Sequence, residues 1–287
     1  MRCSLLFLLL LLCQFPARAQ SELQSIRYPA VATMSDFRSE YPIALLQLAL
    51  KKAGVAAELQ SSAEPMSKSR ALQRLKSSKG IDVVWTMTST EREEQYLPVR
   101  VPIYRGLGSY RLLLIQKEQQ AMFSHLKNNK SMQQLRFAQV HDWVDTEILR
   151  HNKFSILAVS QYENLFQMLL KGRVDAIPRG ALEIEAEAES YQQQGLVIET
   201  DWLIYYPGAV YFFVEKNNIE LATQIEQGLR LAIADGSFLA LFQQFFARHL
   251  QNMRLEERRL IRLSNPFLPA QTPLHDSTLW YQPGPLR

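Results

Sequence analysis

Cysteine is almost absent from this sequence. Its 287 residues include two cysteines, Cys3 and Cys13, and none after position 13. The chain from residue 20 onward therefore has no disulfide framework, no cysteine metal site and no cysteine nucleophile. A chain of this length buries enough apolar surface to fold without such covalent support.

Long apolar runs are equally scarce. The one clear run, Leu5–Cys13, follows the positive Met1-Arg2 start and precedes the small-residue pattern Ala17-Arg18-Ala19. This order is typical of a secretory signal peptide. The alternative, an uncleaved membrane anchor, needs about 20 apolar residues and is disfavoured by length. We therefore expect a signal peptide over residues 1–19, cleavage before Gln20, no membrane span in the mature protein, and localisation in the periplasm.

Charge of either sign is not in large excess. The net charge of +4 falls to about +2 once Arg2 and Arg18 leave with the signal peptide. Lysine and arginine form no dense stripe, so nucleic-acid binding has little support. The five histidines lack a metal-binding spacing such as H-E-x-x-H, and no G-x-S-x-G nucleophile motif is present. We expect no metal, no cofactor and a monomer.

What the chain does have is a regular alternation of short apolar segments and amphipathic helices. One helix is expected over 42–53, where apolar residues share one face, and it ends at Gly54. Another opens at Ser160 and ends at Gly172. Glycine is favoured just after the last turn of a helix. This alternation predicts an α/β fold with largely parallel sheets. Further helices are expected at 221–234 and 238–250. The predicted strands are Val55–Leu59, Ile81–Met87, Tyr110–Ile115, Leu135–Val140, Ile156–Val159, Val174–Ile177, Leu196–Glu199 and Ala209–Val214.

The pattern changes after Leu250. Leu255–Ile261 is expected to form a charged helix. Prolines at positions 266, 269, 273, 283 and 285 then prevent regular structure. The apolar residues of this tail favour an extended strap packed on a lobe, and disorder is the alternative for a proline-rich terminus.

One segment is specific enough to resemble a known family. Gly80–Arg92, with the sequence GIDVVWTMTSTER, resembles the hallmark of family 3 extracellular solute-binding proteins, in which a strand leads to a T-x-E-R turn at the ligand cleft. Four later segments are similar to family motifs in the same order. They are Pro102–Tyr104, the strand at 110–116, Val174–Ile177 with its V-D-A pattern, and 208–216, followed by the D-G turn at Asp235-Gly236.

The resemblance, which covers about residues 24–250, implies a type II periplasmic-binding-protein fold with two discontinuous α/β lobes, a hinge and an interlobe cleft. Lobe 1 would comprise 20–104 plus 213–253, and lobe 2 would comprise 108–208. Residues 254–287 would form the C-terminal helix and strap. Crossings near 102–108 and 206–211 would act as the hinge.

The resemblance also implies ligand-binding residues in lobe 1. Arg92 occupies the place where family members clamp a ligand carboxylate, a task that suits the rigid guanidinium fork; the alternative is a surface arginine paired with a neighbouring glutamate. Thr88 and Ser89 occupy turn positions that offer hydrogen bonds to the same group. Trp85 is either an aromatic cleft wall or a core residue. Tyr104 lies at the first crossing and is also expected at the site.

Lobe 2 departs from the family pattern. The loop around His141 and Trp143 lacks the family's glycines, and both residues are cleft candidates, whereas Asp142 and Asp145 either cap the next helix or face the ligand. Gly180 stands where amino-acid binders have an aspartate. Arg179 before it either attracts an anion or pairs with a glutamate four residues on.

These features favour a non-enzymatic solute-binding protein. It would capture a small polar, carboxylate-bearing ligand, amino-acid-like or a dicarboxylate, and present it to an ABC permease or a periplasmic sensor. Two anions are slightly favoured, because Arg92 and Arg179 would approach from opposite lobes. One alternative is an enzyme on the same fold, dehydratase-like, that uses His141 and Asp142. The other is a regulatory module without a ligand.

Overall fold

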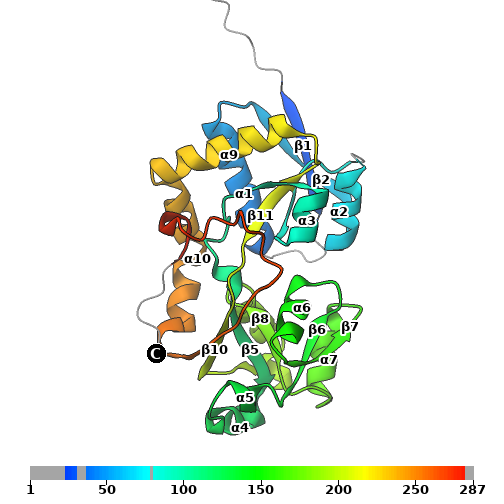
Figure 1. Cartoon of the computed structure of the whole chain (residues 1–287), viewed down its shortest axis with the longest axis vertical. Coiled ribbons are helices and arrows are strands. Elements are labelled where there is room, and N and C mark those ends of the chain that lie inside the picture. Colours follow the sequence, from blue (N-terminus) through cyan, green and yellow to red (C-terminus); the bar gives the residue numbers. More distant parts are fainter. Residues whose placement is uncertain (1–22, 31–36, 78–79, 282–287) are drawn as a thin grey trace, which may run out of the picture.

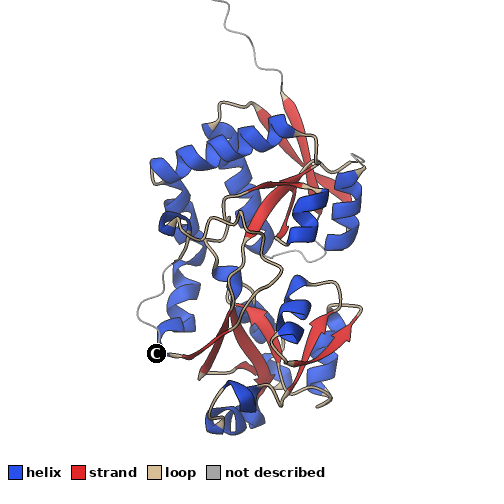
Figure 2. Cartoon of the chain, in the orientation of Figure 1, coloured by secondary structure: helices blue, strands red, loops and turns tan. Residues whose placement is uncertain are grey.

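The computed structural model describes residues 23–30, 37–77 and 80–281. The expected signal peptide, residues 1–19, and the last residues of the tail, 282–287, lie outside this described part. Two α/β lobes lie end to end, joined by several chain segments (Figure 1). Helices surround the strands of both lobes (Figure 2).

Lobe 1 is built on two small sheets. Strands β1 and β2 pair in parallel, and β11 lies between β3 and β4 with both pairings antiparallel. The elements of this lobe are β1 (Gln24–Ala30), α1 (Phe37–Lys52), β2 (Ala57–Pro65), α2 (Lys68–Lys76), β3 (Val84–Met87), α3 (Thr90–Gln95), β4 (Leu97–Val99), β11 (Val210–Val214), α9 (Ile219–Ala234) and α10 (Ser237–Met253).

Lobe 2 has a five-stranded sheet with the order β12-β10-β5-β8, in which β9 also pairs with β5, and a separate pair β6-β7. Its elements are η1 (Leu107–Ser109), β5 (Tyr110–Gln116), η2 (Lys117–Gln119), α4 (Gln120–His125), α5 (Asn129–Met132), β6 (Arg136–Val140), α6 (Val144–His151), β7 (Ser155–Val159), α7 (Glu163–Leu170), β8 (Ile177–Gly180), α8 (Ile184–Ser190), η3 (Gln192–Gln194), β9 (Leu196–Ile198), β10 (Trp202–Tyr205) and, from the C-terminal segment, η4 (Leu255–Glu257) and β12 (Arg259–Arg262).

The expectation of largely parallel sheets is wrong for the central strands. Strand β5 pairs antiparallel with β8, β9 and β10, and β11 pairs antiparallel with both of its neighbours. Both strands directly follow a crossing between the lobes, so they enter their sheets without the helical crossover that makes neighbouring strands parallel. The strand pairs β1-β2, β6-β7 and β10-β12 are parallel.

The helix packing of lobe 1 follows the apolar pattern of the sequence. In α1 the predicted face of Leu45, Leu46, Ala49 and Leu50 is fully buried. It packs on α9, where Gly228 allows the two helices to approach closely: a Cβ at this position would lie 1.8 Å from the carbonyl oxygen of Ala49.

Two chain segments, one before β5 and one before β11, cross between the lobes (Figure 1). They touch each other, because the Ser109 hydroxyl donates a hydrogen bond to the carbonyl oxygen of Gly208 over 2.7 Å. In the first crossing Gly106 has φ +76°, a left-handed conformation that glycine adopts without strain.

The C-terminal segment corrects one prediction. A single 3₁₀ turn, η4, and the strand β12 replace the helix expected over Leu255–Ile261. Strand β12 pairs in parallel with β10; this places Ile261 in the core, 5% exposed, and leaves Arg259 exposed. Free backbone groups at the sheet edge favour strand pairing over local helix propensity here.

The tail after β12 is an ordered strap up to residue 281. It runs from lobe 2 back to lobe 1 beside the two crossings (Figure 1). Thr90 donates its backbone N–H to Phe267 over 3.0 Å, and Tyr281 donates its backbone N–H to Arg105. Short turns include η5 (Ser277–Leu279). The strap is therefore packed, as the sequence favoured.

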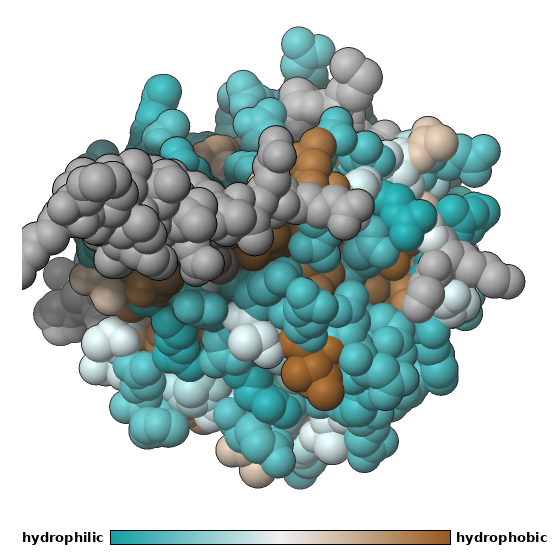
Figure 3. Space-filling model, turned by 90° about the horizontal axis from the view of Figure 1, so that it is seen from above, coloured by the Kyte–Doolittle hydropathy of each residue, from teal (hydrophilic) through white to brown (hydrophobic). Residues whose placement is uncertain are grey.

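Seen from above, the uncovered part of the molecule is mainly hydrophilic, with scattered apolar residues (Figure 3). Within the described ranges, no helix has both the length and the apolar content needed to cross a bilayer.

Candidate functional site

A cavity of about 430 Å³ lies between the two lobes and next to the crossings. Lobe 1 lines it with the end of β1, the start of α2, strand β3 and Arg92. Lobe 2 lines it with Arg111, the start of α6, the start of α7 and the turn after β8. The charged and aromatic residues of its lining are Lys68, Trp85, Arg92, Tyr104, Arg111, Asp142, Trp143, Asp145, Tyr162, Glu163, Arg179 and Glu183.

The cavity gathers five of the eight predicted site residues. They are Trp85, Arg92, Tyr104, Trp143 and Arg179. Thr88, Ser89 and His141 do not line it. Among these, Thr88 is fully buried and donates to Glu93 over 2.6 Å, Ser89 caps helix α3, and His141 is exposed.

Arg92 projects from the first turn of α3, where Ser89 accepts its backbone N–H. Its Nη1 donates to the carbonyl oxygen of Met87 over 2.7 Å and to Thr86 Oγ1 over 3.2 Å. Both acceptors are neutral, and no described carboxylate lies within 4 Å of the guanidinium. Burial lowers the pKa of Arg92, and the more distant Asp145 and Asp142 offset this only in part. The group is thus a positioned cation without a counter-ion of its own.

Arg179 has the opposite character. It is 2% exposed and donates to both carboxylate oxygens of Glu187, over 2.7 and 2.6 Å. Glu183, four residues on, lies 3.0 Å away, so the predicted alternative of local pairing holds. Burial acts to lower the pKa of Arg179, but Glu183 and Glu187 outweigh it and hold the pKa well above its usual value.

The acidic sequence of α8 is not simply a solvated face. Glu187 is 5% exposed, because α8 packs this side chain against the end of β8. The Tyr162 hydroxyl also donates to Glu187. The guanidinium of Arg179 stacks on Trp143 and Tyr162, 4.7 and 5.5 Å from the ring centroids. The aromatic wall and the arginine therefore form one packed unit.

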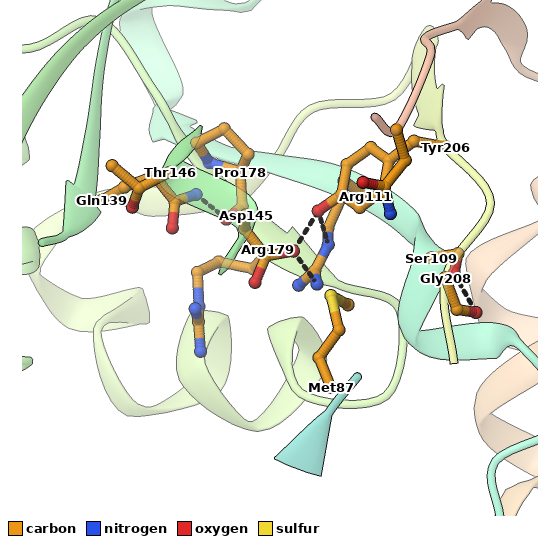
Figure 4. A network of polar contacts seen from close by, with 12 residues as sticks. Met87, Ser109, Arg111, Gln139, Asp145, Thr146, Pro178, Arg179, Tyr206 and Gly208 are labelled. Atoms are coloured by element: carbon orange, nitrogen blue, oxygen red, sulfur yellow. Dashed lines mark hydrogen bonds and ion pairs between the residues drawn. The ribbon is translucent and has the colours of Figure 1, made fainter. Parts of the chain in front are cut away.

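Arg111 was missed by the sequence analysis. It is 6% exposed, follows the first crossing in β5, and its Nη2 donates to Asp145 Oδ1 while Nε donates to the Tyr206 hydroxyl over 2.8 Å. Tyr206 in turn donates to the same Oδ1 (Figure 4). An arginine inside the apolar run 110–115 was the available signal, since a buried charge requires a partner.

Asp145 lies in the first turn of α6 and is 8% exposed. All hydrogen bonds that it accepts fall on Oδ1, and within the described chain Oδ2 accepts none. The expected capping role is not seen, because Trp143 is the N-cap residue of α6 and no side chain caps this helix. A buried carboxylate oxygen therefore remains available at the cavity.

The two lobes also touch across the cavity. Ser69, in the first turn of α2, donates a hydrogen bond to Asp142 of lobe 2. This contact holds the lobes close together and encloses the space between them.

Aromatic side chains complete the lobe 1 wall. Trp85 is 4% exposed and packs on Tyr28 and Phe212, with ring centroids 6.1 and 6.4 Å away. Lys68 lies over the Trp85 ring at 5.1 Å and donates to its carbonyl oxygen. Trp85 is thus both a core residue and a cavity wall. The described residues contain no cluster of three or more metal-ligating side chains.

Comparison with known proteins gives matches in structure alone. No protein-family model and no curated protein sequence matches the chain. An ancestral arginine-binding protein bound to arginine matches at 20% identity and a TM-score of 0.58, over 77% of this chain and 98% of that one. The GluR0 ligand-binding core from Nostoc punctiforme, in complex with L-glutamate, matches at 15% identity and 0.54, over 78% and 99%.

A histidine kinase sensor domain with similarity to periplasmic binding proteins matches at 13% identity and a TM-score of 0.57, over 78% of this chain and 96% of that domain. Likeness at this identity establishes the fold and leaves function to the site. The chain therefore has the two-lobed type II fold that amino-acid-binding proteins and sensor domains share.

Proposed function

We propose that this protein is a periplasmic solute-binding protein that captures a small carboxylate-bearing ligand between its lobes and presents it to a permease or a sensor. The observation that carries the proposal is Arg92: in the described chain it is a cavity-lining guanidinium with no carboxylate within 4 Å. A partly buried cation of this kind is stabilised by an anion that arrives with the ligand.

The geometry supports capture rather than turnover. Of the two residues named for an enzymatic alternative, Asp142 lines the cavity but His141 is exposed and outside its lining. A general acid or base has to lie within hydrogen-bond reach of the reacting group. The structural neighbours described above are binding proteins and a sensor domain.

Arg92→Ala tests the proposal directly. Native mass spectrometry of the gently purified protein should first identify a co-purified small molecule. Calorimetry should then show that Arg92→Ala weakens its binding by about 30-fold or more, since a buried arginine–carboxylate contact contributes about 2–5 kcal/mol. Arg70→Ala, an exposed lobe 1 arginine outside the cavity, is the matched control. Equal affinity in the two variants would refute the role of Arg92.

A further inference from the structure

The two walls of the cavity carry opposite charge. The described lobe 1 residues that line it include Lys68 and Arg92 and no carboxylate. The lobe 2 wall has two arginines, but four carboxylates line the cavity there and a fifth, Glu187, lies behind Arg179. The lining carboxylates of lobe 2 are Asp142, Asp145, Glu163 and Glu183.

The two arginines of the lobe 2 wall do not cancel this excess of carboxylates, because other carboxylates of lobe 2 already pair with them. Glu187 and Glu183 neutralise Arg179, and Asp145 pairs with Arg111. Two carboxylates have no basic partner: within the described residues, no basic group lies within 4 Å of Asp142 or Glu163, and Asp142 accepts a hydrogen bond only from the neutral Ser69. The lobe 2 wall is thus left with acceptors that a cationic ligand group would satisfy.

Asp145 supplies a third acceptor. Arg111 and Tyr206 hold its Oδ1 and so fix the orientation of the carboxylate, while Oδ2 stays unused. Asp145 and Arg92 line the same cavity from opposite lobes. A ligand carboxylate at Arg92 with an adjacent ammonium group at Asp145 Oδ2 matches this pair.

We propose that the cavity selects an amino acid that carries a second cationic group, so that the ligand has a net positive charge. This inference rests on the proposed function and names its ligand class. The α-carboxylate binds Arg92, the α-ammonium binds Asp145, and the side-chain cation binds between Asp142 and Glu163. It replaces the expectation of a ligand with two anions, which required an unpaired Arg179.

The second cation site has an aromatic component. Asp142 precedes Trp143 and Glu163 follows Tyr162 in the sequence, and the centroids of the two rings lie 6.5 Å apart. Each carboxylate is therefore adjacent in sequence to an aromatic residue that also lines the cavity. Ring faces attract ammonium and guanidinium groups, and Arg179 already uses these two rings in this way.

A pair of nearly isosteric probes tests the charge preference. The side chain of L-arginine ends in a charged guanidinium, whereas that of L-citrulline ends in a neutral ureido group. Both keep the α-amino and α-carboxyl groups. Calorimetry on the purified protein, dialysed free of co-purified ligand, should show L-arginine binding at least about 10-fold more tightly than L-citrulline, because a charged hydrogen bond is lost in the latter. L-Glutamate should bind most weakly.

Variants that each remove one carboxylate charge test where the second cationic group of the ligand binds. Asp142→Asn and Glu163→Gln should each reduce the ratio of the affinity for L-arginine to the affinity for L-citrulline by about 5-fold or more. Glu118→Gln, an exposed carboxylate outside the cavity, should leave the ratio unchanged. A ratio that both cavity variants preserve would overturn the assignment of these two carboxylates.

The outcomes separate the inference from the proposed function. Citrulline or glutamate binding as tightly as arginine would overturn the second cation site and leave capture of a carboxylate ligand intact, since all three probes carry an α-carboxylate. Absence of binding by all three would overturn the inference, whereas the proposed function is decided by the co-purified molecule and the Arg92→Ala measurement.

Discussion

The three arginines that line the cavity differ in their surroundings. Arg179 and Arg111 are each buried against carboxylates that raise their pKa above the usual value, although burial alone acts to lower it. Burial lowers the pKa of Arg92 without full compensation. All three side chains remain cations, and they differ in whether the protein itself provides a counter-ion. A ligand anion is needed at Arg92, whereas the other two arginines shape the wall.

The Arg179–Glu187 pair is therefore expected to contribute to stability. In Glu187→Gln, Arg179 loses one of its two counter-ions in a buried site. Breaking a buried ion pair typically costs about 3–5 kcal/mol, and Glu183 should reduce this to the lower end. Urea denaturation measures the loss, with Glu189→Gln, exposed on the same helix, as the control. Equal midpoints for the two variants would show that the pair adds nothing to stability.

Sequence reasoning predicted part of the site and missed part of it for physical reasons. Arg92 lies in the segment that resembles the family hallmark, and Trp143 lies in the loop that takes the place of the family's glycine-rich loop, so local sequence was enough to name both. The partner of Arg179 lies eight residues away, on the far side of the turn between β8 and α8, and helical spacing rules reach only three or four residues. Asp145 likewise depends on Arg111, 34 residues earlier, a contact that only the tertiary fold creates.

At the scale of elements, the expected helices other than 255–261 and most expected strands are found where the apolar pattern placed them, although β8 begins only at Ile177. The missed strands β10 and β12 share a cause. Strand β10 is a short segment of four residues, Trp202–Tyr205, beside polar neighbours, and β12 carries an arginine at each end. Both are defined by pairing with another strand rather than by their own composition, as short strands often are.

The helix start expected at Ser160 shows the same limit. Ser160 and Glu163 have the spacing of a box, but α7 begins at Glu163 itself and Tyr162 is its N-cap residue, with no side-chain cap. The turn before α7 instead places Tyr162 against Glu187 and leaves Glu163 at the cavity. Tertiary contacts of the cavity wall thus override a local signal.

The α1–α9 contact gives a prediction about helix packing. In an exposed helix, Gly→Ala adds about 1 kcal/mol of stability. Gly228→Ala should do the reverse, with a loss of about 3 kcal/mol or more, because the added Cβ overlaps the backbone of Ala49. Thermal unfolding checks this. Gly172→Ala, at φ +63° in open space, should cost only the strain of a left-handed alanine, about 1–2 kcal/mol; the reverse ranking would contradict the packing argument.

At the scale of the whole molecule, the lobes are joined by more than the two hinge crossings. Near its end, helix α10 contacts lobe 2, where His249 pairs with Glu185 and Asn252 donates to the same carboxylate over 2.8 Å. The chain then adds β12 to the lobe 2 sheet and returns to lobe 1 as the strap. Each added connection limits the range of relative lobe movement.

The strap lies directly on the crossings. Asn265 donates to the carbonyl oxygen of Pro207 over 2.8 Å, at the start of the second crossing. The Trp280 ring packs against Gly106 of the first, so closely that a Cβ on this glycine would lie 2.5 Å from it. Opening of the lobes changes backbone angles at such positions, and these contacts would have to break for a wide opening to occur.

Removal of the strap should therefore widen the ligand-free state. A chain that ends after Ser264 keeps β12 but loses the contacts at both crossings. Small-angle scattering should show a larger radius of gyration for this truncated chain than for the full chain without ligand, and similar compact profiles for both with saturating ligand. Since truncation also exposes apolar surface, Trp280→Ala provides a second test: it removes the packing on Gly106 and keeps the backbone of the strap. Circular dichroism controls for folding in both cases. Identical ligand-free profiles for the full chain and both folded variants would show that the strap does not restrain the lobes.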